Sequence, residues 1–143
     1  MTRSLLDVHV LLALLDSDHA DHGRAREWVA GDLVGGWASC PITENGFVRI
    51  LSQPRYPSPV SPSQAATLLS SACTAGDHAF WPCDLSVLDA QHVDPSRGHS
   101  GRHLTDAYLL ALAVAHGGRL VTFDRNIPVS AVPRATAAHM TVL

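Results

Sequence analysis

Short apolar runs and longer amphipathic segments follow one another along the chain. The short runs are bounded by glycine, proline or charged residues, which is typical of buried strands. They predict strands at SLLDV (4–8), GWASC (36–40), HAFWPCD (78–84) and RLVTF (119–123). The longer segments carry apolar residues at helical spacing and predict helices over residues 10–16, 18–31, 41–52, 61–76, 85–93 and 104–116.

Residues with helix-terminal preferences support several of these boundaries. Pro41 begins one helix, and Ser61 is in position to cap another whose first residue is Pro62. Two segments without periodicity predict loops, the proline-rich QPRYPSPVSPS (53–63) and DPSRGHSGRH (94–103). Strands that alternate with helices indicate an α/β fold with a mainly parallel sheet. Because no linker or repeat interrupts the pattern, we expect a single domain over residues 1–143.

Four acidic residues fall where a parallel sheet would gather them. Asp7 and Asp124 follow predicted strands, and Glu44 and Asp106 lie in the first turns of helices. Ligand sites in open parallel sheets lie beyond the carboxyl ends of the strands, so we expect all four at one edge. Ionised carboxylates cannot crowd together unpaired, and oxygen ligands suit Mg²⁺ or Mn²⁺. The pattern therefore predicts a divalent-metal centre that hydrolyses a phosphodiester.

Each acid also has an ordinary structural explanation. Asp7 could cap the following helix, Asp124 could start a turn, Asp106 could offset a helix dipole, and Glu44 could be a solvated helix residue. Their combination favours the metal centre, because the chain has only two glutamates and one of them falls at this edge. Asp7 also interrupts an apolar run, where an unpaired acid is costly.

Composition excludes several other classes. All ten basic residues are arginine, so the chain lacks the lysine that P-loop enzymes, kinases and Schiff-base enzymes require. The net charge of −3 gives no global basic field, so a nucleic-acid partner would need a local patch or metal ions. Three cysteines without a CxxC pair favour neither a disulfide framework nor a zinc ribbon. The N-terminal apolar run is too short to span a bilayer, and we expect a soluble, cytoplasmic protein.

Three segments of the chain resemble the PIN-domain ribonucleases, and in particular the VapC toxins of VapBC toxin–antitoxin pairs. They are LLDVHVLLALL, WASCPITENGFVRILSQP and LTDAYLLALAVAHGGRLVTFDR, which agree in order and spacing. The resemblance implies a three-layer α/β/α sandwich and a Mg²⁺- or Mn²⁺-dependent endoribonuclease. It also implies a homodimer that a cognate VapB-type antitoxin inhibits. Asp7, Glu44, Asp106 and Asp124 match the family's four metal-binding acids, and Thr122 would be a supporting residue near them.

One position departs from the family pattern. Two residues after the first aspartate the family commonly has Asn, Ser or Thr, and here it is His9. Its side chain could form a hydrogen bond near the metal, add a nitrogen ligand that favours Mn²⁺, or have no direct role. This departure keeps open a PIN-like binding module without nuclease activity. An acidic-pocket phosphatase is a further alternative.

Several basic residues near the expected site are candidates for substrate contacts. Arg102 and His103 directly precede the helix that carries Asp106, and Arg125 follows Asp124. Arginine holds phosphate groups in a bidentate manner, so these residues could bind RNA, although each could equally be an ordinary surface residue. The spacing of His99 and His103 also suggests zinc, but no complete ligand set with recognised spacing accompanies it.

Overall fold

The computed structural model describes residues 2–98 and 100–143, in which five strands form one sheet between two layers of helices. The strands are β1 (Ser4–Leu6), β2 (Trp37–Ser39), β3 (His78–Phe80), β4 (Arg119–Thr122) and β5 (Met140–Val142). The helices are α1 (Val8–Leu15), α2 (His22–Asp32), α3 (Pro41–Leu51), α4 (Pro62–Thr74) and α5 (Leu104–Ala115). Single turns of 3₁₀ helix are η1 (Pro95–Arg97), η2 (Gly101–His103), η3 (Val129–Ala131) and η4 (Ala137–His139). None of the described helices is both long and apolar enough to cross a membrane.

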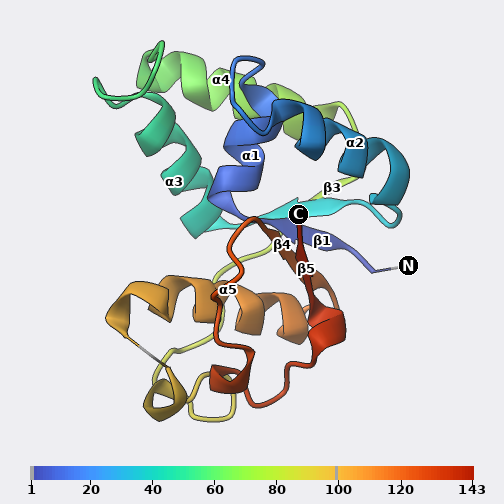
Figure 1. Cartoon of the computed structure of the whole chain (residues 1–143), viewed down its shortest axis with the longest axis vertical. Helices are drawn as coiled ribbons and strands as arrows, with labels where there is room; N and C mark the ends of the chain where they lie inside the picture. The colour runs from blue at the N-terminus through green and yellow to red at the C-terminus, as the bar shows by residue number, and fades with distance from the viewer. Residues whose placement is uncertain (1, 99) are drawn as a thin grey trace.

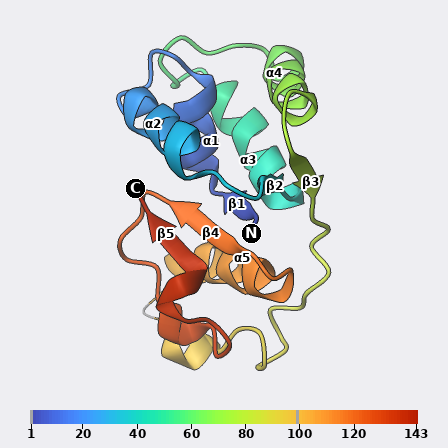
Figure 2. The same cartoon turned by 90° about the vertical axis from the view of Figure 1, so that its right-hand side faces the viewer.

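The sheet has the strand order β3-β2-β1-β4-β5, and each neighbouring pair is parallel. Helices α1 to α4 cover one face, and α5 with the 3₁₀ turns covers the other (Figures 1 and 2). This arrangement confirms the expected α/β/α sandwich with a parallel sheet. The order reverses between β1 and β4, because the chain first builds outward through β2 and β3 and then returns to the other side of β1.

Alternate side chains of the central strands fill two separate cores. Leu5 and Leu120 point to the α5 face, and Leu6 and Val121 point to the face covered by α1 to α4. Successive residues of a strand point to opposite faces, so both layers need apolar residues, and the strands therefore consist of continuous apolar runs. All four of these leucine and valine side chains are almost fully buried.

Most of the predicted elements form within a few residues of their expected ends. Ser61 caps α4 with its side chain and Gln64 completes the capping box, as the Ser-Pro pair predicts. Helix α5 ends in a Schellman motif, in which Gly117 has φ of 69° and the Gly118 N–H donates to the Ala113 carbonyl at 2.8 Å. The helix predicted over residues 104–116 thus ends at this glycine pair.

Two elements differ from the sequence prediction. The helix expected over residues 85–93 does not form, because local side chains bond the backbone instead. Ser86 Oγ accepts from the Leu88 N–H at 3.1 Å and Asp89 Oδ1 accepts from the Gln91 N–H at 3.0 Å, which favours turns. Strand β5 was not predicted, and it consists of three residues that pair with β4 alone.

Candidate metal centre

Asp7 and Asp124 lie at the point where the strand order of the sheet reverses. Asp7 directly follows β1 and Asp124 lies two residues after β4, the strand that pairs with β1. Asp106 reaches the same edge from the first turn of α5. Crevices outside the carboxyl ends of strands at such a reversal are the usual ligand sites of open α/β sheets. The topology therefore brings three of the four predicted acids to one place.

Asp7 is held rigidly by its neighbours in the sheet. Its carboxylate is only 7% exposed and accepts from the Val8 N–H at 2.7 Å and from Thr122 Oγ at 2.8 Å. Thr122 Oγ in turn accepts from the Asp124 N–H at 3.0 Å. The buried Thr122 hydroxyl therefore links the two acids. Each carboxylate oxygen has a second lone pair for a further ligand.

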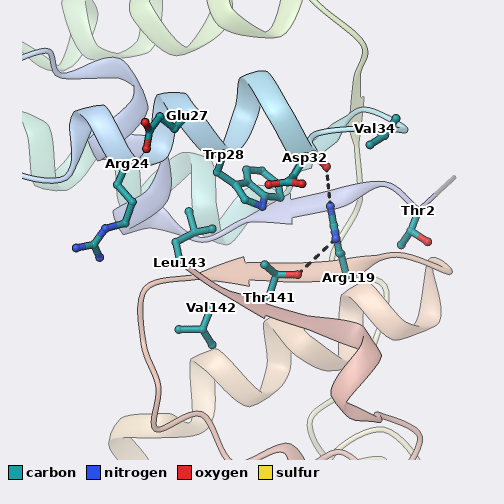
Figure 3. A pocket seen from close by; sticks show the side chains of 10 residues that line it. All are labelled: Thr2, Arg24, Glu27, Trp28, Asp32, Val34, Arg119, Thr141, Val142 and Leu143. Atoms are coloured by element: carbon teal, nitrogen blue, oxygen red, sulfur yellow. Dashed lines mark hydrogen bonds between the residues drawn. The ribbon is translucent and has the colours of Figure 1, made fainter.

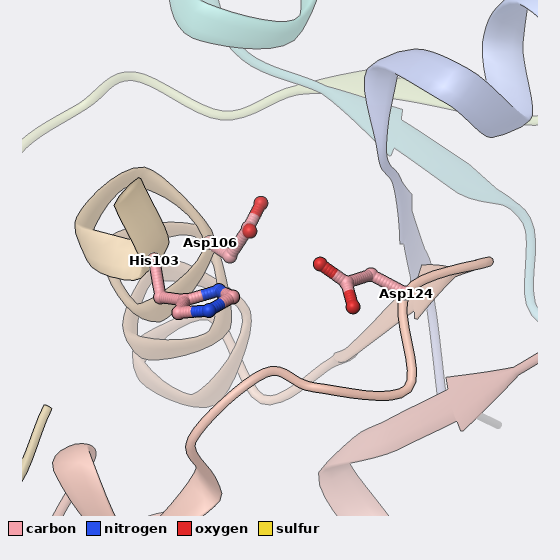
Figure 4. A group of neighbouring side chains, drawn as sticks. All are labelled: His103, Asp106 and Asp124. Atoms are coloured by element: carbon pink, nitrogen blue, oxygen red, sulfur yellow. The ribbon is translucent and has the colours of Figure 1, made fainter. Parts of the chain in front are cut away.

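Asp106 and Asp124 meet the ring of His103 in front of this edge. One donor atom from each of the three residues lies within 4.8 Å of the others, and all three side chains are half-buried. Figure 4 shows the two carboxylates and the imidazole around one space between α5 and the segment after β4. Burial, together with the nearby carboxylates of Asp7 and Asp124, raises the pKa of the Asp106 carboxyl group to about 6. A cation placed here would relieve that crowding.

Glu44, the fourth predicted acid, lies apart from the group of His103, Asp106 and Asp124. Its carboxylate accepts from Ser39 Oγ at 2.6 Å, and Ser39 Oγ also lies 2.8 Å from His78 Nε2. Gly46, two residues further along α3, lies against Val8 beside the acids. Residues two apart on a helix point about 200° away from one another, so the side chain of Glu44 is directed towards β3 instead. Glu44 therefore lies in the predicted first turn of α3 with its carboxylate bonded to Ser39 at the end of β2.

The remaining predicted residues surround the centre at different depths. His9 is exposed in the first turn of α1 and is near enough for its charge to lower the pKa of Asp106. Arg102 and Arg125 are exposed next to His103 and Asp124 respectively, and among the described residues no salt bridge joins either of them to an acid of the group. His99, part of the zinc alternative, lies outside the described residues.

A cleft beside the acids was not predicted from the sequence. It encloses about 540 Å³ between α3 and the N-terminal ends of α1 and α5. Asn45 and Arg49 line one wall, and Val8 and Thr105 line the other. Because Val8 follows Asp7 and Thr105 precedes Asp106, the cleft opens directly beside the metal centre. The spacing of Asn45 and Arg49 at positions i and i+4 of one helix is the signal that could have indicated a shared face.

A larger pocket of about 870 Å³ lies over β5 and α2, and none of the predicted acids lines it (Figure 3). Arg119 is its most prominent charge, but this guanidinium is already engaged. It donates to Ser4 Oγ at 3.0 Å and to the Asp32 carbonyl at 3.1 Å, and it lies over the Trp28 ring. These contacts give Arg119 a structural role. The pocket therefore has fewer side chains available for binding or catalysis than the sheet edge that carries the acids.

Comparisons with known proteins agree with this geometry. The family model described as "PIN domain" matches residues 4–132. The chain is 60% identical over 141 residues to Ribonuclease VapC44 of Mycobacterium tuberculosis, covering 99% of both chains. It is 42% identical over 125 residues to Ribonuclease VapC38 of the same organism, covering 87% of this chain and 86% of that one.

A solved structure also shares the fold. The crystal structure of Mycobacterium tuberculosis VapC20, described as a sarcin–ricin loop-cleaving toxin, superposes with a TM-score of 0.60. The match covers 92% of this chain and 98% of that chain at 13% sequence identity, so it supports the architecture alone.

Proposed function

The chain belongs to the PIN-domain family, among the VapC ribonucleases, and on that premise we propose that it is a metal-dependent endoribonuclease toxin. The observation that carries the proposal is the convergence of Asp7, Asp106 and Asp124 at the switch point of the sheet. Its substrate would be an RNA phosphodiester, and Mg²⁺ or Mn²⁺ would be its cofactor.

The donor atoms of the site fit such an ion. Asp106 and Asp124 each present a half-buried carboxylate to the same space, and Asp7 is fixed beside them by Thr122. Hard oxygen donors of this kind suit Mg²⁺ and Mn²⁺. Burial raises the pKa of Asp106 to about 6, and the neighbouring carboxylates of Asp7 and Asp124 add to the rise, so a cation bound here would stabilise the ionised acids. We assign Asp7, Asp106 and Asp124 as ligands and leave Glu44 out of the set.

The bound ion would supply a water of lowered pKa and offset the charge that develops on the phosphoryl oxygens. The residues of the chain would orient the reacting groups. Thr122 keeps the Asp7 carboxylate from rotating, because it donates to one oxygen while the Val8 N–H holds the other. Fixed orientation of ligands and substrate is a major source of rate acceleration.

The RNA backbone would enter through the cleft beside the acids. Arg49 is an exposed cation on its wall, and Asn45 offers an amide donor and acceptor on the same helix face. Arginine binds phosphate oxygens in a bidentate manner, so Arg49 would hold a phosphate next to the scissile one. Arg102 and Arg125 would add positive charge at the rim.

We also propose a VapB-type antitoxin and a second copy of the chain as partners, as the family implies. An apolar pocket of about 270 Å³ lies between α1, α2 and α4, and Leu11, Leu14 and Val29 contribute to its wall. A groove lined by such residues fits the apolar face of an amphipathic helix. This pocket supports a partner surface on the N-terminal helices.

Purified protein incubated with total RNA and Mn²⁺, with and without a chelator, tests the proposed activity. We expect cleavage that the chelator abolishes. A parallel reaction with a chromogenic phosphomonoester addresses the phosphatase alternative, which predicts turnover of the ester and no cleavage of RNA. Absence of both activities at saturating Mn²⁺ would favour the inactive binding module.

A further inference from the structure

The imidazole of His103 is the one nitrogen donor in the group of side chains that face the metal centre. Its ring nitrogen lies within 4.8 Å of a carboxylate oxygen of Asp106 and of one of Asp124. The residue ends the 3₁₀ turn η2, and the next residue begins α5. His103 is therefore the N-cap residue of α5 and Asp106 lies in the first turn of that helix, and Figure 4 shows the ring edge facing the carboxylates.

Polar contacts elsewhere in the described part of the chain do not account for the position of this ring. Across residues 2–98 and 100–143, no hydrogen bond or ion pair within 4.0 Å engages the His103 side chain. By contrast, His22 bonds the Ala13 carbonyl and His116 stacks on Trp81, so those rings have structural partners. A half-buried imidazole beside two carboxylates and without a partner in the protein is suited to bind a cation.

We propose that His103 is a nitrogen ligand of the metal centre and that it makes Mn²⁺ the preferred ion over Mg²⁺. The inference rests on the proposed metal-dependent function and adds the choice of metal. Mg²⁺ favours all-oxygen coordination and keeps several waters, whereas Mn²⁺ binds more tightly to N/O ligand sets. One imidazole among carboxylates therefore shifts selectivity without removing the oxygen ligands that both ions use.

His9 is the competing source of nitrogen, and its placement argues against it. It is exposed in the first turn of α1, whereas the His103 ring is half-buried and lies within 4.8 Å of both Asp106 and Asp124. His9 therefore does not determine the metal preference, although it lies at a position where the family commonly has a smaller polar residue. The two histidines give a matched pair of variants.

The test compares tag-free wild type, His103→Gln and His9→Gln by calorimetric titration with Mn²⁺ and with Mg²⁺. Pulsed electron paramagnetic resonance of the Mn²⁺-loaded proteins detects nitrogen bound to the ion. We expect a ¹⁴N coupling in wild type and His9→Gln that His103→Gln lacks. We also expect His103→Gln to lose at least about tenfold in Mn²⁺ affinity while its Mg²⁺ affinity changes much less.

His103→Asp is a second variant that keeps a ligand at the position. It replaces nitrogen with oxygen, so the ratio of Mn²⁺ to Mg²⁺ affinity should fall even though total metal binding is retained. A ¹⁴N coupling that survives in His103→Gln, or one that is lost in His9→Gln instead, would overturn the assignment.

The outcome also separates this inference from the proposed function. If Asp106→Asn abolishes Mn²⁺ binding and His103→Gln does not alter it, the nitrogen ligand is refuted and the metal-dependent nuclease stands. If wild type binds neither ion and cleaves RNA in the presence of a chelator, both are refuted.

Discussion

Replacement of Asp106 by asparagine should stabilise the metal-free protein while it abolishes metal binding. The pKa of this carboxyl group rises from 3.8 to about 6, first because it is buried and then because Asp7 and Asp124 lie nearby. A folded-state pKa above the unfolded value means that ionisation costs the folded state free energy. The cost is absent below pH 3.8 and complete once the pH has risen through about 6.

The size of the effect follows from the shift. Each pKa unit corresponds to about 1.4 kcal/mol, so the full shift is worth on the order of 3 kcal/mol. Solvent screens this partly exposed group, and an acid in the first turn of a helix gains about 0.3–1 kcal/mol from the helix dipole. We therefore expect Asp106→Asn to raise the free energy of unfolding by about 1–2 kcal/mol at pH 7.5 in a chelator.

Urea unfolding followed by tryptophan fluorescence measures this difference. The gain of Asp106→Asn over wild type should shrink between pH 6 and pH 4, because both side chains are then neutral in the folded state. Asp18→Asn is the matched control, since Asp18 is exposed in the turn after α1 and should change stability by less than about 0.5 kcal/mol. Saturating Mn²⁺ should stabilise wild type but not Asp106→Asn.

An Asp106→Asn protein that is no more stable than wild type at pH 7.5 in a chelator would refute the reasoning. It would mean that burial and the neighbouring acids do not penalise the ionised Asp106 carboxylate in the folded state. The argument for a cation at this edge would then lose its electrostatic basis.

Three further substitutions test other parts of the account. Thr122→Val removes the hydroxyl that donates to Asp7, so the free energy of unfolding should fall by about 1–3 kcal/mol, and cleavage should slow without a change in RNA affinity. Glu44→Gln should leave Mn²⁺ affinity and cleavage unchanged. If this variant lost both as completely as Asp106→Asn, Glu44 would have to be counted among the metal ligands. Gly46→Ala would place a Cβ 2.7 Å from Val8 Cγ2 and should cost about 1–3 kcal/mol in urea unfolding, a loss that Val8→Ala should relieve.

Much of the fold could be predicted because its signals are local. The apolar runs give β1, β2, β3 and β4, and the Ser61-Pro62 and Gly117-Gly118 pairs mark helix ends that the structure confirms. The parallel arrangement then follows from the alternation of strands and helices. Asp7 and Asp124 could be placed at one edge for the same reason, since each lies within two residues of the end of a strand.

The parts that could not be predicted depend on tertiary contacts or on helix phase. Strand β5 exists because β4 offers it an edge, and a three-residue segment has too little periodicity to signal this alone. Glu44 lies in the expected first turn of α3, but only the packing of Gly46 against Val8 determines which face of the helix meets the acids. The part played by His103 depends on how η2 meets α5, which the loop sequence does not reveal.

The most direct test of the central claim is cleavage of one labelled RNA by wild type and Asp106→Asn, each in Mn²⁺ and in a chelator. Urea unfolding of the same samples shows that both proteins are folded. The account predicts cleavage by wild type in Mn²⁺, none in the chelator, and none by the folded Asp106→Asn protein in either condition. Full cleavage by Asp106→Asn, or by wild type in the chelator, would contradict it.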